Sequence, residues 1–422
     1  MKSIITPTKL QGTIKAIPSK SHAHRVLIAQ KLAQLGEQKK ANPLAIPSFS
    51  KDIEATKSCL SQLDLDNPRL NCGESGSTIR FMIPVTMALK SEATFIGSGK
   101  LPVRPLSPLK EEMEAHGSHF TMTGNTGDNV EICTITGKLS AGTYRLAGNV
   151  SSQFITGLLF ALPLLDGDSK LELTTKLESA GYVDLTLDVL RSFGINIVEG
   201  KSDTGFIIYN ISGNQNYVEP DGMSIQGDWS NASFWLACGA LGDGVTCTGL
   251  DMNSSQRDKE FVDVLEAMGA DVTISHGPDG TDSVTVSRGA GLHGETVSVA
   301  QTPDMVPVLA ALMATASGTS HIVDAERLKI KESDRLKTVC DFLSKLGADI
   351  TVGEADLTIN GRSSLTGGNL SSHNDHRIAM AAAVAACSCE STVTIDDAQA
   401  VAKSYPNFYE DYNSLGGNAT KE

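Results

Sequence analysis

The stretch Phe261–Thr273, FVDVLEAMGADVT, combines a helical pattern, a glycine and a β-type run. Its apolar side chains recur at the spacing of one helix face as far as Met268. Gly269 suits the left-handed residue that follows many helix C-termini, and the Val and Thr after it favour a strand. The same order returns in Leu109–Thr121, Thr186–Val198, Thr338–Thr351 and Phe408–Gly417. The glycines concerned, Gly117, Gly194, Gly269, Gly347 and Gly416, are separated by 77, 75, 78 and 69 residues.

A second repeated segment is an apolar helix that begins with small polar residues. One copy is Ser372–Ala386, SHNDHRIAMAAAVAA, and a helix that is apolar all round is expected to be buried. The other copies are Lys20–Ala33, Ser75–Leu89, Ser151–Leu165, Trp229–Gly242 and Thr302–Gly318. Their start markers, Ser21, Ser77, Ser152, Ser230, Thr302 and Asn374, are 56, 75, 78, 72 and 72 residues apart.

The two patterns alternate along the chain, which predicts six copies of one unit. Each copy would contain a buried helix, an exposed helix and intervening strands, and a weak segment near Ile53–Leu63 supplies the sixth exposed helix. Chance similarity among ordinary α/β segments is the alternative. The matching phase of two independent patterns favours the repeat.

Composition narrows the class of protein. A chain of 422 residues is expected to form more than one domain, and the net charge of −14 argues against a nucleic-acid binder. The N-terminal residues Met1–Leu10 alternate polar and apolar types, so we expect neither a secretory signal nor a membrane span. The eight cysteines show no C-x-x-C spacing, which predicts no metal site and a reduced, cytoplasmic setting. We expect a monomer.

Cations stand at the beginning of three of the apolar helices: Lys20 and Arg25, Arg80, and His376 with Arg377. Helix capping alone explains the Ser, Thr, Asn and Asp residues there. It does not explain the cations, which oppose the helix dipole at a cost of roughly 0.3–1 kcal/mol each. Helix N-termini and cations together favour phosphate or carboxylate groups, so the sequence predicts an anionic ligand at these helix starts.

The charged stretch Glu326–Arg335, ERLKIKESDR, forms a second candidate cluster. We expect a strand that runs into a helix start, with Arg327, Lys329 and Lys331 alternating onto one face. Glu332 would then lie among cations that could hold a phosphate or carboxylate, where it could act as an acid or base. The alternative is a solvated charged turn, which is what most charge runs are.

Taken together, these motifs resemble the family of 5-enolpyruvylshikimate-3-phosphate synthases. The matching stretches are PSKSHAHRVLIA, GNVSSQFITGLLFALPLL, KESDRL, NDHRIAMAAAVAA and AKSYPNF, in the order that the family has. The resemblance implies an α/β fold of the α+β type: two similar lobes, each with three βαβαββ repeats and buried parallel helices, known as an inside-out barrel. One lobe would comprise residues 19–225 and the other residues 1–18 with 226–422. The active site would lie in the cleft between them.

The resemblance also implies a reaction. The enolpyruvyl group of phosphoenolpyruvate would pass to the 5-hydroxyl of shikimate 3-phosphate by addition and elimination, with release of phosphate, on the route to chorismate and the aromatic amino acids. Both substrates are anions, which agrees with the cationic helix starts. The reaction needs a proton donor and a base, but no metal and no organic cofactor. No nucleic acid or membrane is an expected partner.

Matching motif positions imply roles for individual residues. Asp304 resembles the base at the 5-hydroxyl, Glu332 the proton donor and acceptor, and Lys20 a catalytic residue that contacts both substrates. Tyr182 would lie near the shikimate phosphate. The residues implied for shikimate 3-phosphate are Lys20, Ser21, Arg25, Ser151, Ser152, Gln153, Ser179, Asp304, Arg327 and Lys331. The residues implied for phosphoenolpyruvate are Lys20, Gly76, Arg104, Gln153, Arg335, His376, Arg377 and Lys403.

The chain departs from the family pattern in a few places. Arg327 stands where Asn is usual, Phe81 replaces a frequent Pro, and Pro102 interrupts a loop that is commonly more basic. A related family, the UDP-N-acetylglucosamine 1-carboxyvinyltransferases, is the first alternative, but the loop Gly97–Pro105 lacks the reactive Cys typical of it. A non-catalytic anion-binding scaffold is the second, and it would have no need of carboxylates such as Glu332 among its cations.

Overall fold

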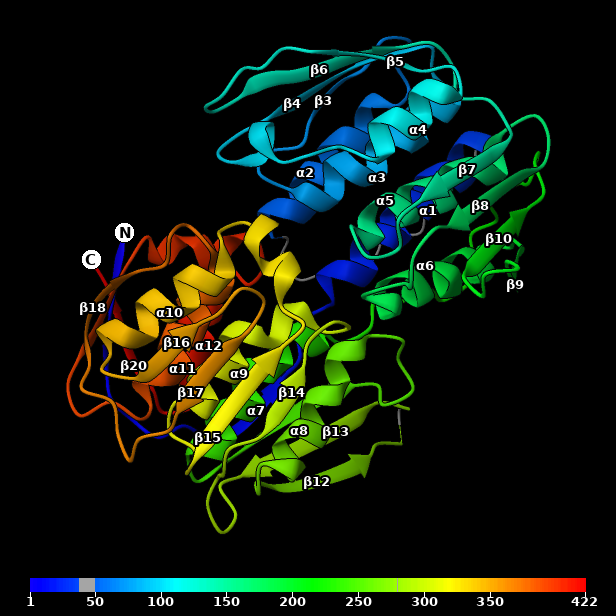
Figure 1. Cartoon of the computed structure of the whole chain (residues 1–422). Helices are drawn as coiled ribbons and strands as arrows, with labels where there is room; N and C mark the ends of the chain where they lie inside the picture. Colours follow the sequence, from blue (N-terminus) through cyan, green and yellow to red (C-terminus); the bar gives the residue numbers. More distant parts are fainter. Residues whose placement is uncertain (38–49, 279) are drawn as a thin grey trace. The chain divides into compact units, whose positions relative to one another are not determined.

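The structure, a computed structural model, describes residues 1–37, 50–278 and 280–422 (Figure 1). The described chain divides into two units, each with its own hydrophobic core. Unit 1 combines Met1–Ser19 with Gln226–Glu422, and unit 2 is the intervening segment Lys20–Ile225. Unit 1 is therefore discontinuous in sequence.

One complete repeat of unit 1 lies between residues 296 and 360. Its elements are β14 (Thr296–Ser298), α9 (Val306–Met313), β15 (Thr319–Val323), α10 (Arg335–Lys345), β16 (Asp349–Val352) and β17 (Leu357–Asn360). The sheet order is β14-β15-β17-β16, in which β14 and β15 are parallel and the other pairs are antiparallel. This segment is a βαβαββ unit of the kind that the sequence predicts.

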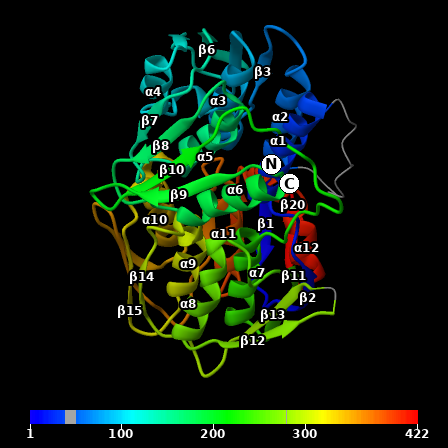
Figure 2. The ribbon, with the colours of Figure 1, turned by 90° about the vertical axis from the view of Figure 1, so that its right-hand side faces the viewer.

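The first strands of the chain complete the other two repeats of unit 1. One repeat contains β2 (Gln11–Lys15), α7 (Trp229–Leu241), β11 (Gly244–Leu250), α8 (Phe261–Ala267), β12 (Asp271–His276) and β13 (Asp282–Ser287). The other contains β18 (Gly368–Ser371), α11 (His376–Ala386), β19 (Val393–Asp396), α12 (Phe408–Ser414), β20 (Asn418–Lys421) and β1 (Lys2–Thr6). Their sheets, β12-β13-β11-β2 and β18-β19-β1-β20, each have one parallel pair. Figure 2 shows the two chain ends beside each other, where β1 pairs with β20.

Unit 2 has two complete repeats in the described residues. The first contains β3 (Arg69–Asn71), α3 (Gly76–Leu89), β4 (Glu92–Gly97), α4 (Leu109–Ala115), β5 (His119–Met122) and β6 (Val130–Thr136). The second contains β7 (Thr143–Leu146), α5 (Ser152–Ala161), β8 (Ser169–Leu173), α6 (Ala180–Ser192), β9 (Ile197–Lys201) and β10 (Ile207–Ile211). The helices α1 (Lys20–Glu37) and α2 (Lys51–Gln62) supply the sixth pair of helices, and α2 confirms the helix expected near Ile53–Leu63.

The two kinds of helix differ in burial as their sequences predict. Every residue of α9 and α11 is buried, because neither helix has a polar face. Helix α10 buries one face only, which includes Leu336, Val339 and Phe342. In unit 1 the buried helices α7, α9 and α11 pack against one another (Figure 1). The glycines after the exposed helices have the left-handed conformation expected of them, with φ of +94° at Gly269 and +84° at Gly347.

The strand predicted at the beginning of ERLKIKESDR is wrong. Residues Glu326–Ile330 form the 3₁₀ helix η5, and Leu328 is its buried residue. A 3₁₀ helix has about three residues per turn, so alternate side chains do not share a face. Accordingly Lys329 is exposed, whereas Arg327 and Lys331 contact different partners. A strand repeats every two residues and a 3₁₀ helix every three. Over five residues with one buried side chain, the sequence pattern does not distinguish the two.

Candidate active site

Arg335 is the centre of a buried charge cluster in unit 1. It is the first residue of α10, and only 1% of its side chain is exposed. Its Nη1 donates to Asp304 Oδ1 at 2.8 Å and its Nη2 to Glu332 Oε2 at 2.8 Å. Its Nε donates to Asp375 Oδ2 at 2.9 Å. One guanidinium thus holds three carboxylates, and they keep its pKa above the ordinary arginine value although burial alone would lower it.

Asp375 connects two helices of this cluster. It is the N-cap of α11, where its Oδ1 accepts the Arg377 amide at 3.0 Å. Its Oδ2 accepts the Ser333 hydroxyl at 2.9 Å in addition to Arg335. Burial alone would raise the pKa of Asp375, but the Arg335 guanidinium more than offsets this, and the pKa lies below its ordinary value. The start of α11 is therefore fixed to the start of α10 through one ionised carboxylate.

Asp304 lies among three cations. Besides Arg335, Lys331 Nζ lies 3.3 Å from its Oδ1 and Arg377 Nη2 lies 3.5 Å from its Oδ2. Arg377 also donates to the Asp304 carbonyl at 3.1 Å and to Ser230 Oγ at 2.7 Å. Burial lowers the pKa of Lys331, although Asp304 opposes this. A lysine with a lowered pKa beside two carboxylates is suited to proton transfer.

The remaining sequence-predicted residues of unit 1 contact backbone atoms or are buried. Lys403 Nζ donates to the Asn374 carbonyl at 2.7 Å, directly before the N-cap Asp375. His376 is buried in the first turn of α11. Arg327 donates to the Ala300 carbonyl at 2.8 Å. Lys403 and His376 therefore adjoin the charge cluster in sequence, and the charge of Arg327 helps to lower the pKa of Lys331 in that cluster.

In unit 2, Arg25 is buried among hydroxyl and carbonyl oxygens. Its Nε donates to Thr186 Oγ1 at 2.8 Å, and its Nη1 and Nη2 donate to the carbonyls of Ser21 at 2.6 Å and Tyr182 at 2.8 Å. Burial lowers the pKa of Arg25 to about 9. The neighbouring cation, Lys20, instead pairs with Asp52 at 2.9 Å.

The start of α5 forms a hydrogen-bonded chain with α3. Ser151 is the N-cap of α5, and its hydroxyl accepts the Gln153 amide at 3.3 Å. The Gln153 side chain donates to Ser77 Oγ at 2.9 Å and accepts from Arg80 Nη1 at 2.8 Å. Ser152 is buried beside this chain. Helix N-termini of two repeats therefore meet through polar side chains.

Gly76, the first residue of α3, lies against two guanidinium groups. A Cβ atom at this position would lie 2.5 Å from Arg104 Nη1 and 2.8 Å from Arg80 Nη1. Real Cβ atoms do not approach other atoms so closely, so a side chain at this position would require the guanidinium groups to move. Two cations at one helix N-terminus repel each other and the helix dipole, and an anion would offset both effects. The segment before Arg104 is the 3₁₀ helix η1 (Leu101–Val103).

Ser179 is the remaining predicted residue of unit 2. It is buried at the N-cap of α6 with φ of +52°, a left-handed conformation that is uncommon for serine. Such a backbone persists only where the surroundings enforce it, and it is frequent at ligand-binding sites.

Comparison with known proteins identifies the family. The sequence profile described as EPSP synthase (3-phosphoshikimate 1-carboxyvinyltransferase) matches residues 50–412. The chain belongs to the EPSP synthase family. It is 44% identical over 432 residues to the 3-phosphoshikimate 1-carboxyvinyltransferase of Clostridium kluyveri, covering 98% of this chain and 97% of that protein. It is 41% identical over 436 residues to the enzyme of the same name from Clostridium perfringens strain 13, covering 99% and 98%.

Solved structures of this family and of a related transferase share the fold. The EPSP synthase of Acinetobacter baumannii matches with a TM-score of 0.77 at 22% identity, and all of both chains is covered. The enolpyruvyl transferase NikO of Streptomyces tendae matches with a TM-score of 0.76 at 17% identity, covering 99% of this chain and 98% of that one. The predicted fold class, the inside-out arrangement of βαβαββ repeats, is confirmed by these matches.

Several polar residues at the site of this family member were not predicted as site residues. Asp375 and Ser230 hold Arg335 and Arg377, and Asp52 holds Lys20. Asp375 and Ser230 stand at helix starts, which is the one signal that could have singled them out. For Asp52 the partner lies in a different helix, and the sequence gives no sign of the pairing.

Among residues 1–37, 50–278 and 280–422, no three His, Cys, Asp or Glu side chains gather in a way that could hold a metal ion. In the same part of the chain, none of the helices has the length and hydropathy needed to span a bilayer. All eight cysteines are free thiols.

Proposed function

We propose that the chain carries out the reaction of its family. In this proposal some polar residues transfer protons and others bind the two substrates. The enzyme transfers the enolpyruvyl group of phosphoenolpyruvate to the 5-hydroxyl of shikimate 3-phosphate and releases phosphate. This reaction belongs to the shikimate route to aromatic amino acids. The observation that best supports catalysis is the contact of Asp304 and Glu332 with a single buried guanidinium, that of Arg335.

The proton chemistry is assigned to unit 1. Glu332 protonates the methylene carbon of phosphoenolpyruvate while Asp304 takes the proton of the attacking 5-hydroxyl. The resulting tetrahedral intermediate expels phosphate as Glu332 takes a proton back from the methyl group, and the proton held by Asp304 leaves with the phosphate. Because Glu332 and Asp304 both accept hydrogen bonds from Arg335, the guanidinium holds them at fixed positions. Lys20 and Lys331 are assigned to neutralise charge on the phosphates, and Lys20 remains a catalytic candidate.

Substrate binding is assigned to both units. We assign shikimate 3-phosphate to Lys20, Ser21, Arg25, Ser151, Ser152, Gln153, Ser179, Asp304, Arg327 and Lys331. We assign phosphoenolpyruvate to Lys20, Gly76, Arg104, Gln153, Arg335, His376, Arg377 and Lys403. The paired guanidinium groups at Gly76 support an anion there, and the helix starts of α3 and α5 supply amide donors. Arg327 has the weakest support, because its described hydrogen bond is to a backbone carbonyl of its own unit.

A phosphate-release assay tests the function. Phosphate release from phosphoenolpyruvate should require shikimate 3-phosphate and should not occur with UDP-N-acetylglucosamine as the acceptor. Turnover with the UDP-sugar alone would overturn the assignment, and binding of both anions without phosphate release would favour a non-catalytic scaffold.

We also propose a monomeric enzyme of the cytoplasm that needs no cofactor and binds neither nucleic acid nor membrane. The free state of all eight cysteines and the net charge of −14 support this setting. Sedimentation of the pure protein at several concentrations should give a single species of 44.6 kDa.

A further inference from the structure

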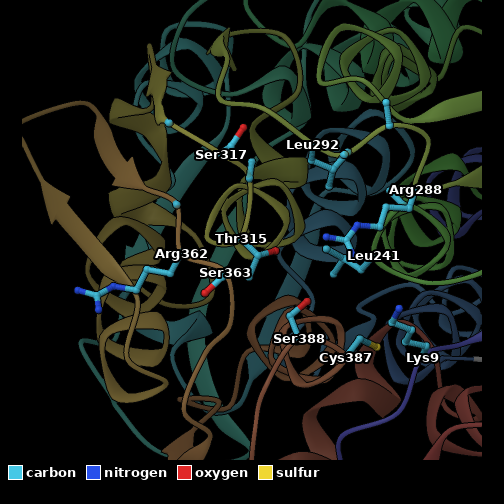
Figure 3. A pocket seen from close by; sticks show the side chains of 16 residues that line it. Lys9, Leu241, Arg288, Leu292, Thr315, Ser317, Arg362, Ser363, Cys387 and Ser388 are labelled. Atoms are coloured by element: carbon cyan, nitrogen blue, oxygen red, sulfur yellow. The ribbon is translucent and has the colours of Figure 1, made fainter.

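A cavity of 660 Å³ lies in unit 1 at the ends of three buried helices (Figure 3). Leu241 is the last residue of α7, Cys387 directly follows α11, and Thr315 lies two residues beyond the end of α9. The N-terminal ends of the same helices carry Ser230, Asp304 and Arg377, which contact one another. The three helices are therefore parallel. Since α7 has 13 residues, the cavity is separated from that cluster by about 20 Å of helix.

The lining of the cavity combines polar and apolar surface and has a cationic side. Leu241, Leu292, Ala316 and Cys387 are buried, and Thr315 and Ser388 supply hydroxyl groups. Figure 3 shows the Arg288 guanidinium directed between Leu241 and Thr315, with Lys9 beside Leu241. In the part of the chain that the structure describes, neither Arg288 nor Lys9 has a carboxylate within ion-pair distance. Both side chains are exposed, so an anion can reach them from solvent in a protein whose net charge is −14.

Helix capping alone does not account for this arrangement. Cations near helix C-termini stabilise the helix dipole, and each contact is worth roughly 0.3–1 kcal/mol. Capping requires contact with the terminal carbonyls but no cavity. Arg362 shows the contrast within the same lining: Figure 3 shows its side chain directed away from Arg288, and it pairs with Asp349 at 4.0 Å. A volume of 660 Å³ is in the range of sites for small organic ligands.

We propose that this cavity binds a small organic acid, in which an apolar body carries one carboxylate or phosphate group. Arg288 and Lys9 bind the oxyanion, and the hydroxyls of Thr315 and Ser388 add hydrogen bonds. Leu241 and Leu292 contact the apolar body, whose transfer from water contributes the remaining affinity. The site lies at the opposite ends of the helices from Asp304 and Arg377, so it is distinct from the proposed active site.

The test uses two probes that share an aromatic ring and differ in the anion: 3-phenylpropionate and phenyl phosphate. Binding of each probe to the full chain is measured by ligand-observed NMR and calorimetry. Arg288→Gln and Lys9→Gln should each weaken the binding of at least one probe about 10-fold or more, which corresponds to about 1.4 kcal/mol. The probe that responds distinguishes a carboxylic acid from a phosphate ester as the natural ligand class.

Arg362→Gln is the matched control, because Arg362 is an exposed arginine of the same lining, as Arg288 is, but its side chain points elsewhere. It should leave probe binding within twofold of the wild-type value. Equal binding by the wild type, Arg288→Gln and Arg362→Gln would overturn the proposal, and so would equal weakening by the two arginine variants. Probe molecules that bind the active site contribute equally to all variants, because none of these substitutions lies in the proposed catalytic machinery. Enolpyruvyl transfer by Arg288→Gln should remain within twofold of wild type whether or not the probes bind.

Discussion

The two units hold their buried cations in different ways. In unit 1, Arg335 contacts three carboxylates and no described neutral acceptor, whereas in unit 2 Arg25 contacts hydroxyls and backbone carbonyls. Carboxylates can exchange protons near neutral pH, but hydroxyls and carbonyls cannot. This difference supports the proposal that unit 1 supplies the proton transfer and unit 2 mainly the binding. Unit 2 also has ion pairs, such as those of Lys20 with Asp52 and Lys31 with Asp64.

The largest expected effect is the loss of turnover in Glu332→Gln. The amide can still accept a hydrogen bond from Arg335 but cannot exchange the proton, so kcat should fall about 10²–10⁴-fold. The KM values should stay within a fewfold of wild type. Steady-state kinetics check this, with Glu326→Gln on the exposed part of η5 as the control. If kcat stays within threefold of the wild-type value, Glu332 of unit 1 is not the proton donor of the reaction.

The next effect concerns the stability of unit 1. Arg335→Met leaves Asp304, Glu332 and Asp375 without their common partner, and breaking such a buried contact costs about 3–5 kcal/mol. Urea unfolding should show an earlier transition for unit 1 and an unchanged transition for unit 2. Lys337→Met is the control, because this lysine is exposed in its pair with Asp334 and should contribute less than about 1 kcal/mol.

An equal shift of both transitions would show that the two units unfold together. If the free energy of unfolding of Arg335→Met equals that of the wild type, the three carboxylates do not destabilise unit 1 when their common cation is removed, and the prediction is wrong.

Gly76→Ala tests the binding role of unit 2. The added Cβ would meet the Arg104 guanidinium at 2.5 Å, so Arg104 must move. The KM for phosphoenolpyruvate should rise about 10-fold, or about 1.4 kcal/mol, with a smaller change in kcat. Gly36→Ala is the control, since no atom lies within 4 Å of its Cβ position. A fall in kcat with an unchanged KM would place catalytic chemistry in unit 2.

A pH-dependent change of stability is expected in Asp258→Asn. Burial raises the pKa of Asp258 to about 6 from an ordinary value of 3.8, and Arg377 only partly opposes this. Between these values the unfolded chain loses the proton first, so the stability contributed by this group falls as pH rises through this window. Relative to wild type, the variant should therefore be more stable at pH 8 than at pH 4, by roughly 2 kcal/mol.

Urea midpoints at the two pH values measure the difference. Asp263→Asn on α8 serves as an exposed control in the same segment. A stability difference of the same size at pH 4 and pH 8 would show that Asp258 is ionised throughout this range.

Local patterns in the sequence predicted much of the fold. The apolar run of α11 and the glycine at Gly269 depend on neighbours within one turn of helix, so periodicity was sufficient to identify them. The contacts of Arg335 could not be predicted in this way. Its carboxylate partners Asp304 and Asp375 lie 31 and 40 residues away, and only the packing of three elements brings them together.

Some site residues could likewise be recognised from the local sequence, whereas others depend on partners that are distant in the chain. Helix starts marked by cations predicted Arg25 and Arg377, because an unfavourable charge at a helix N-terminus can be recognised locally. Asp52 and Ser230 are ordinary helix-start residues in sequence, and their roles depend on the cation that reaches them. The strand expected in Glu326–Ile330 failed because one buried residue, Leu328, fits several periods.

The position of the N-terminal strands has a consequence for biosynthesis. Lys2 in β1 pairs with Asp396, so about 390 residues must leave the ribosome before that pairing is possible. At 5–20 residues per second this takes roughly 20–80 s. All of Lys20–Ile225 emerges during that interval, so unit 2 can fold while the nascent N-terminal segment still lacks its partners. The first strand to be translated is thus among the last to be fixed.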